Sequence, residues 1–245
     1  MKLLLLHKCP NFLQPVDQRL PPKLKSYCNR RRLISVSASV GGKGNALSFN
    51  SSIEGPAIKV AAIAGSLRKA SFNRGLIRSA IEIAKECIPQ MEIEPLEIGH
   101  LPFLNTDLEV GDSFPQAVEE LRAKVLQVDS ILFASPEYNY SVTAPLKNAI
   151  DWGSRPPNVW ANKAAAIMSA GGGFGGGLAQ YHLRQIGVFL DLHFINKPEL
   201  RIHAFQPPAK FDSDGNLIDN ETRERVKGIL LSLHAFTVRL QNKQG

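Results

Sequence analysis

The chain has 245 residues, 44% of them hydrophobic, which is enough for one substantial domain with an ordinary core. Its net charge of +7 would suit a nucleic-acid or membrane-surface partner, but nine of the 29 Lys and Arg and only two of the 22 Asp and Glu lie in residues 1–55. The rest of the chain therefore carries 20 basic and 20 acidic residues, and a body without net charge argues against nucleic-acid binding.

Residues 1–55 form a basic, serine-rich leader that is poor in acidic residues. This composition is typical of a transit peptide for a plastid or mitochondrion, and the alternative is a disordered basic tail on a cytoplasmic protein. The apolar run at 3–6 is too short for a secretory signal, and no stretch of the chain reaches the ~20 apolar residues of a membrane span. We predict a leader at 1–55 and a soluble domain at 56–245.

From Ile58 onward short apolar runs alternate with longer amphipathic stretches, which is the pattern of βα units around a parallel sheet. The first half predicts a strand at 58–64, a helix at 73–87, a strand at 91–98 and a helix at 115–128. The second half predicts a strand at 130–135, a short helix at 145–151, a strand at 163–170 and a helix at 177–190. A fifth strand follows, either at 193–195 alone or continuing to 202, and then a turn at 212–215 and a closing helix at 220–240.

These elements predict an α/β fold, a flavodoxin-like three-layer sandwich with a five-stranded parallel sheet, preceded by a disordered leader. Ligands of such sheets bind beyond the carboxyl ends of the strands, where the strand order reverses. We therefore expect the function in the loops after the first, third and fourth strands.

The loop after the first strand, residues 65–73, carries Ser66, Arg68, Ser71 and Asn73 at the start of a helix. A helix N-terminus offers unpaired N–H groups and a partial positive charge, so this loop is predicted to bind a phosphate group. It lacks the Gly-Lys-Ser/Thr ending of a nucleotide P-loop. The alternative is that Ser71 or Asn73 simply caps the helix, which would explain one polar residue but not the cluster.

The loop after the third strand reads Pro136, Glu137, Tyr138, Asn139, Tyr140. A flavin ring needs a flat wall and polar partners for its pyrimidine edge, and these residue types supply both. Alternatively, the two tyrosines pack at the edge of the loop.

The loop after the fourth strand contains Ser169 and the glycines Gly171, Gly172 and Gly173 in a run that continues to Gly177. Missing side chains allow a ligand to approach the backbone closely. The glycine spacing matches a dinucleotide fingerprint, but that fingerprint belongs to the opening turn of a βαβ unit. We interpret the loop as a flexible wall over a flavin.

Together with the segment Leu146–Trp152, these three loops resemble the NADPH-dependent FMN reductase and quinone reductase family over roughly residues 57–240. The resemblance implies non-covalent FMN, with its phosphate in the first loop and its ring between the second and third. It also implies NADPH or NADH as donor, a quinone as acceptor, and a two-electron ping-pong reaction that requires no catalytic side chain. Two departures are Thr143-Ala144, where many members have Pro-Gly, and Leu178, where an Arg is frequent.

The resemblance further implies a homodimer or homotetramer, with the segment around Asp151 and Trp152 at the subunit contact. The alternatives are a reductase of free flavin, chromate or azo compounds, a non-catalytic flavodoxin-like electron carrier, and a flavin-binding regulatory subunit. Electron carriers of this type are usually strongly acidic, which the neutral body is not. The histidines have no metal-ligand spacing and the body lacks paired cysteines, so no metal site is expected.

Overall fold

The structure is a computed structural model that describes residues 56–111 and 113–242. The predicted leader lies outside these residues. The described strands are β1 (Ile58–Ala64), β2 (Met91–Leu96), β3 (Ser130–Ala134), β4 (Ala164–Gly171), β5 (His193–Phe194) and β6 (Leu200–His203). The helices are α1 (Phe72–Cys87), α2 (Gln116–Leu126), α3 (Ala144–Ser154), α4 (Gly177–Leu190) and α5 (Asn220–Gln241), with a short 3₁₀ helix, η2 (Thr106–Leu108).

All strands of the sheet are parallel, in the order β2-β1-β3-β4-β5, and β6 also pairs with β4. The chain moves from β1 outward to β2 and then returns to place β3 on the other side of β1. Ala64 pairs with Ala134, and Ala134 pairs with Met168, so the three central strands finish close to one another. This reversal of direction is the position at which open α/β sheets bind ligands.

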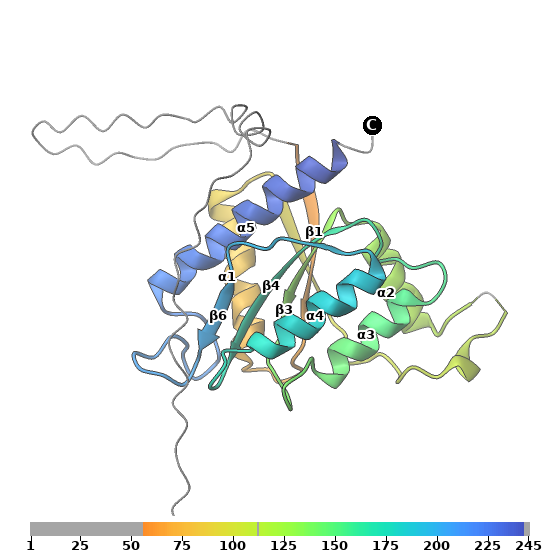
Figure 1. Cartoon of the computed structure of the whole chain (residues 1–245), viewed down its shortest axis with the longest axis horizontal. Coiled ribbons are helices and arrows are strands. Elements are labelled where there is room, and N and C mark those ends of the chain that lie inside the picture. The colour runs from red at the N-terminus through yellow and green to blue at the C-terminus, as the bar shows by residue number, and fades with distance from the viewer. Residues whose placement is uncertain (1–55, 112, 243–245) are drawn as a thin grey trace, which may run out of the picture. The chain divides into compact units, whose positions relative to one another are not determined.

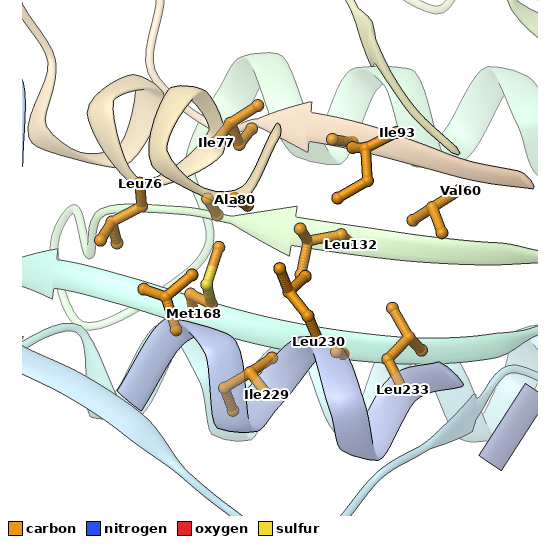
Figure 2. Packing of buried hydrophobic residues seen from close by; sticks show 14 of the residues in the cluster. Val60, Leu76, Ile77, Ala80, Ile93, Leu132, Met168, Ile229, Leu230 and Leu233 are labelled. Carbon is orange, nitrogen blue, oxygen red and sulfur yellow. The ribbon is translucent and has the colours of Figure 1, made fainter. Parts of the chain in front are cut away.

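The helices cover both faces of the sheet and give three layers (Figure 1). On one face, Leu76 of α1 and Leu230 of α5 pack with Val60 and Leu132 of the sheet in one buried cluster (Figure 2). On the other face, side chains of α2, α3 and α4 form a second cluster with Phe133. The alternate residues of β3 thus enter separate cores, as a strand buried on both faces requires. The predicted flavodoxin-like sandwich is confirmed.

The predicted fifth strand is broken into β5 and β6, which both lie along β4. Along β4, only Ala166 and Ile167 lie between the residues that pair with β5 and those that pair with β6. Five residues, 195–199, lie between β5 and β6 themselves, so this segment cannot continue the pairing residue by residue. The segment 195–199 contains Pro198, which has no N–H to donate to a neighbouring strand. The break between β5 and β6 therefore falls where Pro198 cannot donate a backbone hydrogen bond to a neighbouring strand.

The predicted helix at 145–151 is longer in the structure, because α3 continues to Ser154. The buried Arg122 of α2 explains this extension. Its guanidinium donates hydrogen bonds to the carbonyl oxygens of Trp152 (3.0 Å), Arg155 (2.9 Å) and Pro157 (2.9 Å). A cation at this end of a helix satisfies the last carbonyl groups and complements the helix dipole.

None of the helices in the part of the chain that the structure describes is long and apolar enough to cross a membrane.

Candidate functional site

The three loops predicted to carry function meet at the carboxyl ends of β1, β3 and β4 (Figure 1). The N–H of Gly65 donates to the carbonyl oxygen of Ala134 (2.9 Å), and the N–H of Ser135 donates to that of Met168 (3.2 Å). The buried hydroxyl of Thr143 donates to the carbonyl oxygen of Gly65 (2.5 Å). Thr143, a departure from the resembled pattern, therefore fixes the start of α3 to the first loop.

The first loop leads into α1 with two buried hydroxyl groups. Ser66 and Ser71 are 4% and 6% exposed, and Ser71 occupies the N-cap position without a side-chain capping hydrogen bond. Arg68 is exposed, and its guanidinium donates to the carbonyl oxygen of Ala70 (3.2 Å). Simple capping by Ser71 is therefore not what this loop does. Serine hydroxyls, an arginine and a helix N-terminus are the donors that a phosphate group needs.

Two of the predicted site residues use their side chains to hold the scaffold. The amide of Asn73 donates to the carbonyl oxygen of Ala170 and accepts from the N–H of Ala170, both at 2.9 Å, which ties α1 to β4. The carboxylate of Glu137 accepts from the N–H groups of Leu178 (2.8 Å) and Ala179 (3.4 Å) at the start of α4. A carboxylate is stabilising there because it satisfies free N–H groups at the positive end of the helix dipole. Neither side chain is free for a ligand in this arrangement.

Ser169 is also committed to the scaffold. Its fully buried hydroxyl donates to the carbonyl oxygen of Gly175 (2.6 Å) and accepts from the amide of Gln180 (2.7 Å). The same amide of Gln180 donates to the carbonyl oxygen of Leu200 (2.8 Å). The hydroxyl of Ser169 thus holds the backbone of the glycine loop at Gly175. No sequence pattern pointed to Gln180, because its role depends on the packing of α4 against the sheet.

The second loop is a tight turn that presents aromatic side chains. Tyr138 and Ser141 exchange backbone hydrogen bonds of 3.1 and 3.0 Å, and the two residues between them, Asn139 and Tyr140, have φ values of 50° and 62°. These positive values describe a type I′ turn, in which an L-residue costs about 1 kcal/mol or more and Asn or Gly is preferred. Tyr138 and Tyr140 are 49% and 64% exposed, so they are not core residues.

The glycines of the third loop are of two kinds. Gly175 and Gly176 have φ values of 59° and 84°, and a Cβ on Gly176 would lie 2.5 Å from the Cβ of Ser169, so the fold requires glycine there. A Cβ on Gly172 or Gly173 would meet no atom within 4 Å, and neither has a left-handed φ. The fold does not require glycine at these two positions. The open space over them is what the close approach of a ligand to the backbone would use.

The expectation that Trp152 lies at a subunit contact is wrong. Trp152 is fully buried, its indole N–H donates to the carbonyl oxygen of Pro102 (2.8 Å), and its ring packs edge-on against Phe114. Asp151 pairs with Lys147 at 2.8 Å on the same helix. A tryptophan before a loop suits either a core or an interface by composition, and here α2 and the segment after β2 cover it.

Across residues 56–111 and 113–242, no group of three or more His, Cys, Asp and Glu side chains could hold a metal ion. Residues 58–206 match the NADPH-dependent FMN reductase family. The chain belongs to this family.

Several known proteins resemble the chain over most of their length. The NADPH:quinone oxidoreductase of Arabidopsis thaliana is 66% identical over 77% of this chain and 96% of its own. A quinone reductase of Escherichia coli K12 is 39% identical over 75% of this chain and 97% of its own. The solved structure of FerB, a flavoenzyme NAD(P)H:(acceptor) oxidoreductase from Paracoccus denitrificans, has a TM-score of 0.63 with 31% identity, over 74% of this chain and 97% of that one.

Membership of the NADPH-dependent FMN reductase family confirms three predictions made from the sequence. The resemblance itself, an oxidoreductase as the class of enzyme, and FMN with NAD(P)H as the cofactors all agree with the family. Family membership does not identify which individual residues bind FMN, because that depends on where their side chains point.

Proposed function

We propose that this chain is an FMN-dependent oxidoreductase that passes two electrons from NAD(P)H to a quinone. The observation that carries the proposal is the open space over Gly172 and Gly173 beside a helix N-terminus with buried hydroxyl groups. The fold explains neither feature, and a flat ring with a phosphate tail fits both. The names of the relatives from Arabidopsis thaliana, potato and rice support a quinone as acceptor.

The groups that would hold the FMN phosphate are the hydroxyls of Ser66 and Ser71, the guanidinium of Arg68 and the free N–H groups of the first turn of α1, including the backbone N–H of Asn73. Backbone donors at a helix N-terminus favour an anion through both hydrogen bonding and the dipole. Arg68, which is exposed and not buried in an ion pair, is the charged member of this set.

The ring of the cofactor would lie between the turn 136–140 and the glycines Gly171, Gly172 and Gly173. The chemistry that FMN supplies when bound is two-electron transfer between a nicotinamide and an acceptor. The protein contributes orientation: Glu137 holds the second loop to α4, Thr143 holds it to the first, and Ser169 holds the third. No side chain is assigned a proton transfer.

The experiment that tests the proposal begins with the spectrum of the purified full chain. We expect flavin absorption bands that NADPH bleaches and a soluble benzoquinone restores, with steady-state NADPH oxidation. A flavin that NADPH does not bleach would instead indicate an electron carrier or a regulatory subunit. Turnover with free flavin, chromate or an azo dye far above that with benzoquinone would favour the second candidate, a reductase of those acceptors.

Arg68→Ala tests the phosphate assignment. Loss of a charge-assisted hydrogen bond should weaken FMN by about 1.5–3 kcal/mol, roughly ten- to a hundredfold, and riboflavin, which lacks the phosphate, by much less. Lys69→Ala, the neighbouring base in the loop, is the control and should have the smaller effect on FMN. Equal weakening of FMN and riboflavin in fluorescence titrations would contradict the assignment.

We also propose a homo-oligomer, now through α4 instead of Trp152. Tyr181, Val188 and Phe189 of this helix are 57%, 83% and 88% exposed, which is unusual for three large apolar side chains on one helix. Light scattering should detect a dimer or tetramer that Phe189→Glu dissociates, while Leu126→Glu, a change at an exposed leucine of α2, does not.

For residues 1–55 we propose a targeting leader to a plastid or mitochondrion, on composition alone.

A further inference from the structure

Tyr140 has a backbone conformation that its side chain disfavours. Its φ of 62° is at the second central position of the turn Tyr138–Ser141, where glycine is the preferred residue. The ring is 64% exposed, so burial in the core does not hold it there. Strain of this kind persists where the surrounding structure imposes it, and it concentrates at ligand sites.

The ring of Tyr140 contacts a second exposed aromatic ring from the neighbouring loop. Phe174 lies with its ring centroid 6.0 Å from that of Tyr140, at an interplanar angle of 66°. Phe174 is 58% exposed and follows the two open glycines, in a turn closed by the N–H of Gly175 and the carbonyl oxygen of Gly172 (2.9 Å). An edge-to-face pair of exposed rings leaves ring faces available for a third aromatic group.

The turn that carries Tyr140 is fixed to α4 at both ends. Glu137 accepts from the N–H of Leu178 (2.8 Å), and the Ser141 hydroxyl lies 2.9 Å from Nδ1 of His182. Phe174, in contrast, follows Gly172 and Gly173, whose surroundings are open. The turn that presents Tyr140 is therefore held by two side-chain hydrogen bonds, and the glycines that precede Phe174 have open space around them.

We propose that Tyr140 and Phe174 select flat aromatic acceptors, by packing a quinone ring against both side chains beside the candidate flavin site. The inference rests on the proposed function and extends it, because it names the residues that discriminate a benzoquinone or naphthoquinone from an acceptor that is not flat. Both are specificity-determining residues, and neither transfers a proton or an electron. The strained turn is the means by which the Tyr140 ring is presented at a fixed place.

The test compares kcat/KM for 1,4-naphthoquinone with that for ferricyanide, an octahedral acceptor that cannot stack, at saturating NADPH. In Tyr140→Gly and in Phe174→Ala the ratio of the two values should fall about tenfold, the size of one stacking contact, and the double variant should fall little further because the rings act together. Tyr140→Phe should retain the ratio. Phe103→Ala, which removes an 80% exposed ring from the segment after β2, is the matched control and should leave the ratio unchanged.

A second readout needs no turnover. Calorimetry should detect binding of naphthalene-2-sulfonate, a flat and redox-inert probe, that is about tenfold weaker in Tyr140→Gly than in the wild type. The thermal midpoint of Tyr140→Gly should be equal to or above that of the wild type, since glycine relieves the strained turn, and this excludes misfolding as the cause.

Unchanged acceptor ratios in the variants, or equal binding of naphthalene-2-sulfonate by wild type and Tyr140→Gly, would overturn the inference. A wild-type protein without flavin and without NADPH oxidation would contradict the proposed function instead. In that case the probe still decides the role of the two rings, because its binding is measured without the cofactor reaction.

Discussion

At the scale of single residues, the glycine loop contains two kinds of position. At one kind the fold itself requires glycine, and at the other glycine leaves room for a ligand. Gly176 has a left-handed φ and no room for a Cβ, whereas Gly172 and Gly173 have open space. The sequence shows an unbroken glycine run and gives no basis for this division, because it depends on the side chain of Ser169 beneath the loop.

Gly172→Ala and Gly176→Ala should therefore have opposite effects. For Gly176→Ala the left-handed backbone and the 2.5 Å contact with Ser169 should lower the free energy of unfolding by about 2 kcal/mol or more. For Gly172→Ala the unfolding free energy of the apoprotein should stay within about 0.5 kcal/mol or rise, while FMN binds about tenfold more weakly. Urea unfolding and flavin titration measure both quantities, and normal FMN affinity in Gly172→Ala would argue against a ligand over this glycine.

Only part of the candidate site could be predicted from the sequence, and the reason lies in the partners of single side chains. The residue types of the three loops were sufficient to place a phosphate and a flat ring at one edge of the sheet. The partners of Asn73, Glu137 and Ser169 could not be predicted, since each bonds to backbone groups 97, 41 and 6 residues away. A polar residue near a ligand loop can face the ligand or the scaffold, and only the packing decides between them.

At the scale of elements, apolar periodicity predicted the strands and helices of the described chain closely. The N-cap side chain of Asp219 accepts a hydrogen bond at the start of α5, and that of Asn105 does so at the start of η2. The failures are at β5 and β6, where Pro198 interrupts a strand, and at α3, where Arg122 from another helix extends the end. The first could be suspected from the proline. The second depends on a contact between elements that sequence periodicity does not report.

Asp219 begins the longest helix, α5, and its carboxylate accepts from the hydroxyl (2.5 Å) and the N–H (2.8 Å) of Thr222. Asp219→Ala should lower the free energy of unfolding by about 1 kcal/mol, and Asp219→Asn, which keeps an acceptor, by less. Chemical denaturation at neutral pH measures the difference.

The contribution of Asp219 should depend on pH. The hydroxyl and the N–H of Thr222 hold the pKa of this carboxyl below its ordinary value of 3.8. A carboxyl with a lowered pKa in the folded state stabilises the fold above its unfolded pKa and loses this effect as the pH falls through the folded value. The stability difference between wild type and Asp219→Ala should shrink below pH 4, and a constant difference down to pH 2 would exclude the charge as its source.

At the scale of the whole molecule, we propose that residues 56–245 form an independent domain, since all elements of the site and both cores lie within it. Pro56 itself contacts α5, with its carbonyl oxygen 3.2 Å from Nε2 of His234. A protein that starts at Pro56 should fold, bind FMN and oxidise NADPH like the full chain. A protein that starts at Val60 loses the buried Ile58 and should be less stable. Thermal unfolding and flavin content measure both, and loss of flavin in the protein from Pro56 would place part of the site in the leader.

The hydrogen bonds that join the three loops have a consequence for how such a site can change. Thr143 bonds the second loop to the first, and Glu137 bonds it to the start of α4, directly after the third. A loop transplanted alone from a relative would arrive without the partners that shape it, and it would leave the carbonyl oxygen of Gly65 and the first N–H groups of α4 without these hydrogen bonds. New acceptor preferences should therefore be obtained most readily by exchanging the three loops together, or by changing only side chains such as Phe174 that take no part in these bonds.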